Sequence, residues 1–450
     1  MTAPTLRPYQ SDLVSRVLAS DKRRSLVVLP TGGGKTRVAA EIIARWPGRA
    51  VFVADRQELV EQAAGAMPEA GVLIGSAYRP GSPMIVGVHT ISRRDLRLDA
   101  DLVVVDEAHM AAAPTWRKVL SWYPEARILG LTATAYRYGG GSLADLFDEA
   151  IAGPSVPDLI SQGFLCPVRT FASREDVACA ARVRAGEFVA EDLDRIMRGQ
   201  VLRSAVDLWG ARYGGKRTIA FATSKAHAHD LWDAMRWYGP GMVVSEDTPK
   251  ADRASARQRL AEGSLRFLVS IDALGIGFDC PPVEVGLMCR PTLSRGVYRQ
   301  QAGRIMRTAP GKAGAVLLDM AGNVARHGLP TAPDITDLNG KVIPIPKRGR
   351  LVGMVNCPKC LCVYEEEACP ECGTPRPHQK RVLRTVSGTL DEVIGIEATG
   401  AQEWAQRATP EAREAWCRKK LRAGWSPKQI AAVHKRMFGV WPDRSVWDAA

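Results

Sequence analysis

Short apolar runs, rich in β-branched residues, alternate with amphipathic stretches along the first third of the chain. The pattern predicts strands at residues 25–29, 50–54, 101–106 and 127–133, and helices over 35–46 and from about Gln57. DLVVVD and RILGLTA lack the alternation of a strand with one wet face, so we expect them inside a parallel sheet covered on both faces. An α/β domain is therefore predicted over residues 1–150.

The same alternation starts again after a less regular segment, 151–202, which contains AGPSVPD and is interpreted as a connector. The pattern then predicts strands at 218–223, 241–245, 266–271, 285–290 and 315–320, and helices at 225–238, 252–262 and 297–307. A second α/β domain of similar construction is therefore expected over residues 203–335.

The composition changes beyond this second domain. IPIPKRGR is a basic, proline-punctuated linker, and the last segment, 377–450, is basic and holds five of the eleven tryptophans. We expect an α-helical tail there, with helices at about 410–423 and 427–437. Its tryptophans either stack on nucleic-acid bases or form the core of a small helical bundle, and the bundle is favoured because a short fold needs large apolar side chains.

The net charge and the hydropathy of the chain indicate which kinds of partner to expect. The formal net charge of +13 favours a polyanionic partner, because phosphates neutralised by lysine or arginine release condensed counterions. No apolar run approaches the roughly 18 residues that cross a bilayer. The start, MTAPTLRPYQSDL, does not resemble a secretory signal. We therefore expect a cytoplasmic protein with no membrane partner.

LPTGGGKT follows an apolar strand and opens a helix, which is the context of a phosphate-binding loop. Its glycines let backbone N–H groups face phosphates at the positive end of the helix. Lys35 is expected to reach the β- and γ-phosphates, and the Thr36 hydroxyl to bind Mg²⁺. The alternative is an ordinary glycine-rich loop, because Leu29 replaces the first glycine of the general pattern.

VVVDEAH ends an apolar strand with two consecutive carboxylates. Asp106 is expected to hold Mg²⁺, and Glu107 to orient and deprotonate the attacking water. His109 is either part of the same machinery or a structural histidine.

Together with LTATAYR and YRQQAGRIMR, these segments resemble the ordered motifs of superfamily 2 helicases of the DEAH type, over about residues 5–325. The resemblance implies an α/β fold of two RecA-like parallel-sheet lobes in tandem, and an ATP hydrolase that moves along nucleic acid with ATP and Mg²⁺. It implies that Gln10 contacts adenine with support from Arg7. The full ATP-binding set implied is Arg7, Gln10, Thr31, Gly32, Gly33, Gly34, Lys35, Thr36, Asp279 and Gln300.

Two arginines of YRQQAGRIMR, Arg304 and Arg307, stand at i and i+3 of one predicted helix, so both can point across a cleft. The resemblance implies that they face the nucleotide held by the first lobe, where a guanidinium stabilises the transferring phosphoryl group. The alternative is a basic, solvated helix face. The predicted catalytic residues are thus Glu107, Lys35, Arg304 and Arg307.

The resemblance also assigns residues to movement and to the track. His109, Thr132 and Thr134 are expected to couple hydrolysis to movement. The expected nucleic-acid contacts are Arg56, Thr90, Ser224 and Ser270. Because half of the machinery lies on each lobe, ATP binding should close the cleft between them.

A narrower resemblance is to RadD-like bacterial helicases, through DTPKADRASARQRLAEG, DMAGN and cysteine pairs after the second lobe; related phage helicases would look similar. It implies DNA as the partner and a role in repair, recombination or phage replication. RNA as the track, and a clamp or remodeller that does not separate strands, are the alternatives. A restriction motor with its own nuclease is less favoured, because no convincing carboxylate and lysine cluster is present.

CPKC and CPEC form two C-x₂-C pairs within residues 350–376, and clustering of this kind in a cytosolic chain favours a metal over disulfides. Four thiolates complete a tetrahedral, structural Zn²⁺ site. The expected ligands are Cys357, Cys360, Cys369 and Cys372. Cys362 is a spare cysteine or an alternative ligand, and free thiols are the other possibility.

Overall fold

The computed structural model describes most of the two predicted lobes and parts of the chain beyond them. The described residues are 5–136, 142–172, 178, 181–184, 187–271, 279–332, 338, 355–357, 359, 362–364, 367–376, 414, 417, 430–431 and 434. Everything up to His378 belongs to one compact unit, and residues 379–450 form a second one. The linker IPIPKRGR and the five tryptophans of the tail lie outside the described residues.

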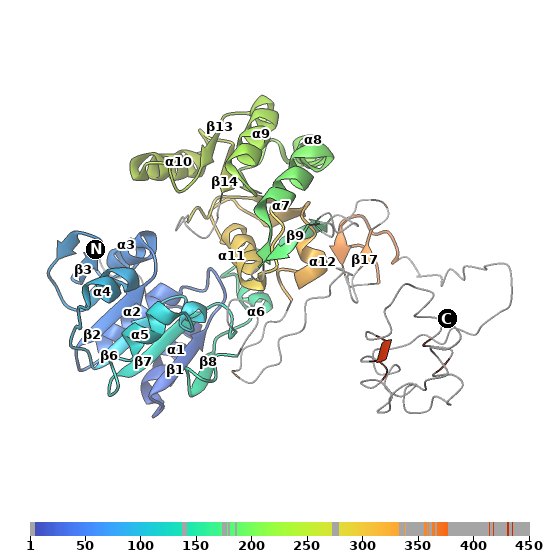
Figure 1. The fold of residues 1–450 in the computed structure, drawn as a ribbon. Helices are drawn as coiled ribbons and strands as arrows, with labels where there is room; N and C mark the ends of the chain where they lie inside the picture. Colours follow the sequence, from blue (N-terminus) through green and yellow to red (C-terminus); the bar gives the residue numbers. More distant parts are fainter. Residues whose placement is uncertain are drawn as a thin grey trace. The chain divides into compact units, whose positions relative to one another are not determined.

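Lobe 1 is built on an eight-stranded sheet. Its strands are β1 (Arg24–Val28), β2 (Ala50–Ala54), β3 (Gly71–Ile74), β4 (Ala77–Arg79), β5 (Met84–Gly87), β6 (Leu102–Val105), β7 (Arg127–Thr132) and β8 (Glu149–Ala152). They lie in the order β4-β3-β5-β2-β6-β7-β1-β8, and only the edge strand β4 is antiparallel to its neighbour (Figure 1). The four predicted strands are confirmed to within one residue at each end as β1, β2, β6 and β7.

Helices cover both faces of this sheet, as the uninterrupted apolar strands require. They are α1 (Pro8–Ala19), α2 (Lys35–Arg45), α3 (Gln57–Ala66), α4 (Val88–Arg94) and α5 (Pro114–Leu120). Residues at alternate positions of β2 enter different cores: Phe52 packs with α1, α2 and α3, whereas Val51 and Val53 pack with α4 and α5. The polar carboxyl ends of the parallel strands are therefore left at one edge of the sheet, where α2 and α3 begin.

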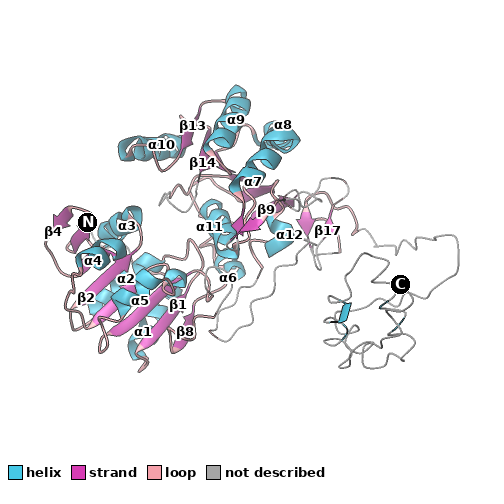
Figure 2. Cartoon of the chain, in the orientation of Figure 1, coloured by secondary structure: helices cyan, strands magenta, loops and turns pink. Residues whose placement is uncertain are grey.

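Lobe 2 has a six-stranded parallel sheet in the order β13-β14-β12-β15-β16-β9 (Figure 2). Its strands are β9 (Val168–Ala172), β12 (Thr218–Ala222), β13 (Gly241–Val244), β14 (Phe267–Ile271), β15 (Val285–Met288) and β16 (Ala315–Asp319). Its principal helices are α8 (Leu202–Tyr213), α9 (Lys225–Met235), α10 (Lys250–Glu262), α11 (Arg295–Ile305) and α12 (Asn323–His327). The five predicted strands are confirmed to within two residues as β12 to β16.

The segment interpreted as a connector is more ordered than predicted. It holds α6 (Val156–Ser161), the hairpin β10 (Val183–Arg184) and β11 (Glu187–Phe188), and α7 (Ala190–Ile196). It also supplies β9, which pairs in parallel with β16 and forms the edge of the lobe 2 sheet. The segment is therefore partly a connector and partly the first strand of the second sheet.

The predicted helix over 297–307 is displaced by two residues, because α11 spans Arg295–Ile305. Met306 has φ −85° and ψ 0°, so the chain has left the helix before Arg307. Arg304 and Arg307 therefore do not lie on one helix as predicted. Arg304 is in the last turn, and Arg307 forms a β-bridge with Leu165 of the inter-lobe segment.

The cysteine-rich segment packs onto lobe 2. Its short strands β17 (Val355–Asn356) and β18 (Val363–Tyr364) pair with each other, and Cys362 forms a bridge with Phe171 of β9. Tyr364 is buried in the core that β9 shares with α8 and α9. In the tail, the few described residues, 414, 417, 430, 431 and 434, are helical and fall within the two predicted helices.

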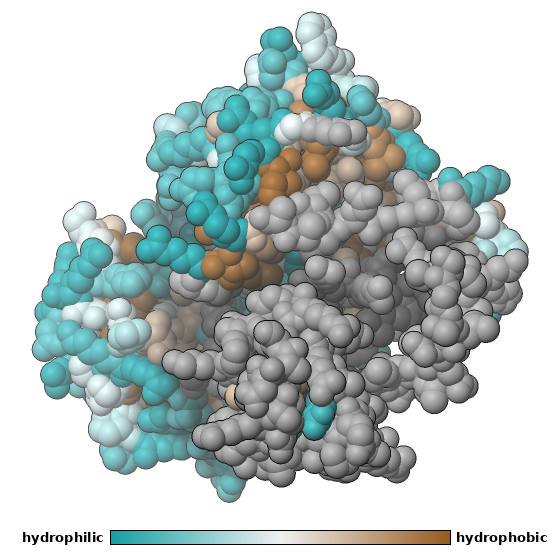
Figure 3. All heavy atoms as spheres, turned by 45° about the vertical axis from the view of Figure 1, so that its right-hand side comes forward, coloured by the Kyte–Doolittle hydropathy of each residue, from teal (hydrophilic) through white to brown (hydrophobic). Residues whose placement is uncertain are grey.

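The surface that the structure describes can be followed on one face of the molecule in Figure 3. In the view of Figure 3 hydrophilic residues cover most of it, and apolar residues gather in the upper part. In the part of the chain that the structure describes, no helix combines the length and the apolar character needed to cross a bilayer.

Candidate functional site

The phosphate-loop segment turns sharply between β1 and α2. Gly32 and Gly34 have φ of 86° and 85°, a left-handed conformation that favours glycine. A Cβ on Gly34 would stand 2.4 Å from Nε2 of Gln10, so a side chain there would have to displace the Gln10 amide. The backbone N–H groups at the start of α2 therefore face a cavity with Lys35 and Thr36 beside them.

The two carboxylates of DEAH follow β6 directly. Asp106 is 5% exposed, and its Oδ1 accepts a hydrogen bond from the Glu107 backbone N–H at 3.0 Å. Burial and the neighbouring Glu107 charge raise the pKa of Asp106 to about 7. A cation would stabilise the ionised form of this buried carboxyl, and with the Thr36 hydroxyl it offers the hard oxygen ligands that Mg²⁺ prefers.

The pKa of Glu107 shifts in the opposite direction to that of Asp106. Burial alone would raise the pKa of Glu107, but Lys35, His109 and Arg304 together lower it to about 2. Its φ of 49° is also unusual for a residue with a side chain, and strained backbone of this kind clusters at functional sites. Glu107 is therefore a charged carboxylate held at the cavity wall.

A chain of polar contacts leads from Glu107 to the end of β7. His109 Nδ1 lies 3.3 Å from Glu107 Oε2 and 3.4 Å from Thr132 Oγ1. The Thr132 hydroxyl in turn donates to the Thr134 carbonyl at 2.8 Å. The three residues expected to couple hydrolysis to movement thus form a chain of contacts that starts at Glu107 and runs through His109 and Thr132 to Thr134.

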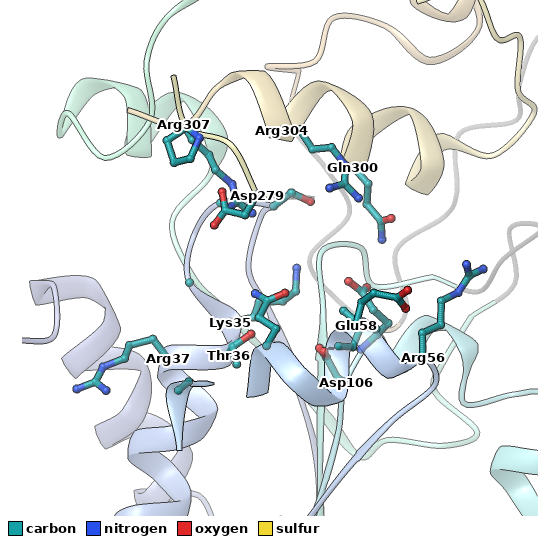
Figure 4. Close-up of a pocket in the computed structure, with 18 of the residues that line it drawn as sticks. Lys35, Thr36, Arg37, Arg56, Glu58, Asp106, Asp279, Gln300, Arg304 and Arg307 are labelled. Atoms are coloured by element: carbon teal, nitrogen blue, oxygen red, sulfur yellow. Dashed lines mark hydrogen bonds and ion pairs between the residues drawn. The ribbon is translucent and has the colours of Figure 1, made fainter. Parts of the chain in front are cut away.

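One cavity of about 490 Å³ is lined from both lobes. Lobe 1 contributes the phosphate loop, Asp106 and Glu107, and lobe 2 contributes Gln300, Arg304 and Arg307. Figure 4 shows Gln300 and Arg304 projecting from their helix toward Lys35 and Asp106. Burial and the nearby Arg307 lower the pKa of Arg304 to about 10, while the Glu107 charge opposes this.

Arg307 is paired within lobe 2. Its guanidinium makes an ion pair with the carboxylate of Asp279, and both residues line the cavity (Figure 4). Arg307 must therefore exchange a carboxylate for a phosphate if it is to act on a nucleotide.

Two further ion pairs join the lobes beside the cavity. Arg253 of α10 donates to Glu58 at 2.8 Å, and Lys250 donates to Glu61 at 2.6 Å, both on α3. These contacts hold the lobes together through charged groups that are partly exposed to solvent.

The far end of the cavity contains an aromatic residue that sequence reasoning missed. Phe164 lines the cavity, the Arg7 guanidinium lies 4.8 Å from its ring centroid, and Tyr9 packs edge-on against it at 5.2 Å. An aromatic ring with a guanidinium beside it is a surface on which a nucleobase can stack. Phe164 lies in the connector, far from any motif, so only its aromatic character could have drawn attention to it.

Gln10 is hydrogen-bonded to the phosphate loop. Its Nε2 donates to the Gly33 carbonyl at 3.0 Å, and Gln10 is not among the residues that line the cavity. The Tyr9 hydroxyl donates to the same carbonyl at 2.8 Å. In this structure the Gln10 side chain holds the phosphate loop through the Gly33 carbonyl. Its contact with adenine stays a prediction.

The four expected nucleic-acid contacts are spread over both lobes. Arg56 follows β2 and lines the cavity, and the Thr90 hydroxyl on α4 accepts from the Gly75 backbone N–H at 2.8 Å. Ser224 caps α9 by accepting from the His227 N–H at 3.0 Å, and Ser270 lies near the end of β14. The structure does not bring these four together in one site.

Three of the four predicted metal ligands are clustered. The sulfur atoms of Cys357, Cys369 and Cys372 all lie within 4.8 Å of one another, and no disulfide joins them. The Lys359 N–H donates to the Cys357 sulfur at 3.4 Å. Cys360 lies outside the described residues, and Cys362 is not part of the cluster.

Comparison with known proteins supports a helicase in both lobes. The family model described as "Type III restriction enzyme, res subunit" matches residues 3–137, and "Helicase conserved C-terminal domain" matches residues 200–309. A 51.5 kDa protein of a Lactococcus phage is 26% identical over 359 residues, which cover 77% of each chain. A putative ATP-dependent helicase of Saccharomyces cerevisiae, IRC3, is 25% identical over 74% of this chain and 54% of its own length.

A solved structure shares the fold. A fragment of a putative HsdR subunit of a type I restriction enzyme from Vibrio vulnificus is 21% identical, with a TM-score of 0.55, and the match covers 73% of this chain and 67% of that one. The chain thus spans about three quarters of its phage relative but little more than half of the yeast one. Residues 3–137 and 200–309 thus match the domains of helicase-type proteins, and the chain is an ATP-hydrolysing enzyme that acts on nucleic acid.

Proposed function

We propose that the protein is a DNA helicase or translocase of the DEAH, RadD-like kind, in which ATP hydrolysis between the lobes drives movement along DNA. One observation carries the proposal: Lys35 and Glu107 of lobe 1 and Arg304 of lobe 2 line the same cavity. A nucleotide held there contacts both lobes. Its binding therefore favours the closed arrangement of the lobes, and its hydrolysis allows them to open.

The residues divide the chemistry between them. Lys35 binds the phosphates, and bound Mg²⁺ would neutralise part of their charge while held by Asp106 and Thr36. Lys35, His109 and Arg304 lower the pKa of Glu107 and so keep it ionised, and in this proposal its carboxylate orients the attacking water and accepts its proton. Arg304 and Arg307 stabilise the charge on the transferring phosphoryl group from the opposite lobe.

DNA is the favoured track, and repair, recombination or phage replication is the favoured process. The basic chain, with a net charge of +13, suits either nucleic acid, so charge alone does not choose between them. Similarity to a phage protein and to an ATP-dependent helicase supports a motor that works on nucleic acid at large.

The experiment that tests this function is an ATPase assay with single-stranded, duplex and forked DNA and with single-stranded RNA of matched sequence. We expect single-stranded or forked DNA to stimulate turnover by about tenfold or more, because closure of the lobes depends on the track. Lys35→Ala is the background control and should show no stimulated turnover. Hydrolysis that no nucleic acid stimulates would contradict the proposal, and stimulation by RNA alone would assign the RNA track instead.

Strand separation needs a separate measurement, since a clamp or remodeller also hydrolyses ATP. We expect ATP-dependent displacement of a labelled strand from forked DNA, or displacement of a third strand by translocation. Stimulated hydrolysis without either displacement would assign a remodeller.

We also propose that the cysteine cluster holds a structural Zn²⁺. Three soft sulfur ligands converge there, and a backbone N–H donates to one of the sulfurs, which suits a bound metal thiolate. With Cys360 as the fourth ligand no position is left open for catalysis. The segment packs against β9, so its role in this proposal is to secure the edge of lobe 2.

Elemental analysis of the purified protein is expected to give about one zinc per chain. Cys369→Ser should lose the metal and lower the melting temperature, because a site that binds only the folded chain stabilises it. Cys289→Ala changes a buried cysteine that is not one of the three clustered sulfurs, and it should keep its zinc. A zinc content near zero in untreated protein would remove the assignment.

A further inference from the structure

The backbone just after α11 is held by three separate hydrogen bonds. Lys312 Nζ donates to the Ile305 carbonyl at 2.6 Å and to the Arg307 carbonyl at 2.8 Å, and the Cys166 N–H donates to the Met306 carbonyl at 2.8 Å. Three consecutive carbonyls therefore have a donor. The backbone from the end of α11, which carries Arg304, to Arg307 is therefore held in place by these hydrogen bonds.

Lys312 also reaches a second segment of the site. Its Nζ donates to the Pro281 carbonyl at 2.9 Å, two residues beyond Asp279. Asp279 is the ion-pair partner of Arg307. One ammonium group thus joins the backbones on both sides of the Arg307–Asp279 pair.

The N–H donors of the Lys312 ammonium group all have an acceptor. An ammonium group has three N–H donors, and the three carbonyls use all of them. A positive charge at the carboxyl end of α11 is also favourable, because the helix dipole is negative there. Burial lowers the pKa of Lys312, so the carbonyls compensate for lost solvation of the charge.

The local turn aims Lys312 back at the helix end. The Lys312 N–H donates to the Ala309 carbonyl at 3.1 Å, and Gly311 has φ 75°, which favours glycine at that position. The loop between α11 and β16 could connect them without contacting the Arg307 backbone. Instead it places the Lys312 ammonium group against the Arg307 carbonyl. A mere connection would not require this placement.

We infer that Lys312 is a positioning residue for ATP hydrolysis, which fixes the backbone of Arg307 and of the Asp279 segment so that the Arg307 guanidinium meets the transferring phosphoryl group. The inference rests on the proposed function of the site. When Arg307 exchanges Asp279 for a phosphate, only its side chain has to move, because Lys312 keeps both backbones in place. Fixed geometry of this kind lowers the cost of reaching the transition state.

The test is the turnover of Lys312→Met in the full-length protein with single-stranded DNA. We expect kcat to fall by about tenfold to a hundredfold, while the Kd of ATP changes by less than about threefold. Lys312→Arg keeps the charge and several donors and should recover most of the lost kcat. Lys216→Met, which removes a partly exposed ion pair with Glu284 in the same lobe, should behave as wild type.

A double-mutant cycle separates positioning from general stabilisation. On an Arg307→Ala background, Lys312→Met should lower kcat by less than about twofold, since the residue through which it acts is gone. Equal losses on both backgrounds, or a wild-type kcat in the single variant, would overturn the inference. If Lys312→Met is unfolded at the assay temperature, Lys312→Gln, which keeps two N–H donors, replaces it in the same cycle.

Failure of this inference is distinguishable from failure of the proposed function. If the wild-type protein shows no nucleic-acid-stimulated ATPase, the motor itself is wrong. If wild type is active and Lys312→Met matches it, only the role of Lys312 is wrong.

Discussion

Glu107→Gln is expected to lower the kcat of ATP hydrolysis by about a thousandfold, with ATP still bound. Glutamine has nearly the same shape, but its amide cannot accept a proton from water. Lys35, His109 and Arg304 lower the pKa of Glu107, so its carboxylate in the wild type is ionised throughout the neutral range and has an oxygen that can accept a proton. The variant should therefore bind nucleotide and nucleic acid and stop before hydrolysis.

The measurement is single-turnover hydrolysis together with the Kd of a fluorescent ATP analogue. Glu41→Gln is the matched control, since Glu41 lies on α2 and pairs with Arg45 at 2.8 Å on the surface. Its turnover should stay within about twofold of wild type, because a surface ion pair contributes little. If Glu107→Gln turns over normally, Glu107 is not the base.

Arg307→Ala is expected to slow hydrolysis by about a thousandfold or more, which is the usual contribution of an arginine that contacts the transferring phosphoryl group. Its effect on ATP binding should be much smaller, because the interaction strengthens only as charge develops in the transition state. Removing the guanidinium also leaves Asp279 without its ion-pair partner.

Three variants make this result specific. Arg307→Lys should recover only part of the activity, because a point charge cannot copy the guanidinium fork. Arg203→Ala, at an exposed position of α8, controls for the loss of a surface charge in lobe 2. Equal losses in kcat and in ATP affinity for Arg307→Ala would assign it a binding role instead.

Nine of the fourteen strands in the two large sheets were predicted from the sequence, and β3, β4, β5, β8 and β9 were missed. β1, β2, β6 and β7 are central strands of continuous apolar residues, and such a pattern is visible in the chain itself. β9, VRTFA, is at an edge and contains a charged residue, so its burial is uneven. It is a strand because of its partner β16, about 150 residues away, and a local pattern does not show that partner.

Some residues of the candidate site could likewise be predicted from the sequence, and others could not. Lys35, Thr36, Asp106 and Glu107 were predictable because each follows a strand at the carboxyl edge of one sheet, where parallel strands gather their ends. Phe164 was not, because it reaches the cavity only through the path of the chain between the lobes. The spacing of Arg304 and Arg307 suggested one helix, whereas the helix ends at Ile305 and a bridge to Leu165 places the second arginine.

The pairing of β9 with β16 has a consequence for synthesis on the ribosome. The first sheet has all of its strands once β8 has emerged, so lobe 1 can fold while the rest of the chain is still being made. β9 emerges next but must wait for Asp319 before its partner strand exists. Until then VRTFA is a strand segment without its partner in the nascent chain, and its Phe171 and backbone groups are exposed to aggregation or to chaperones.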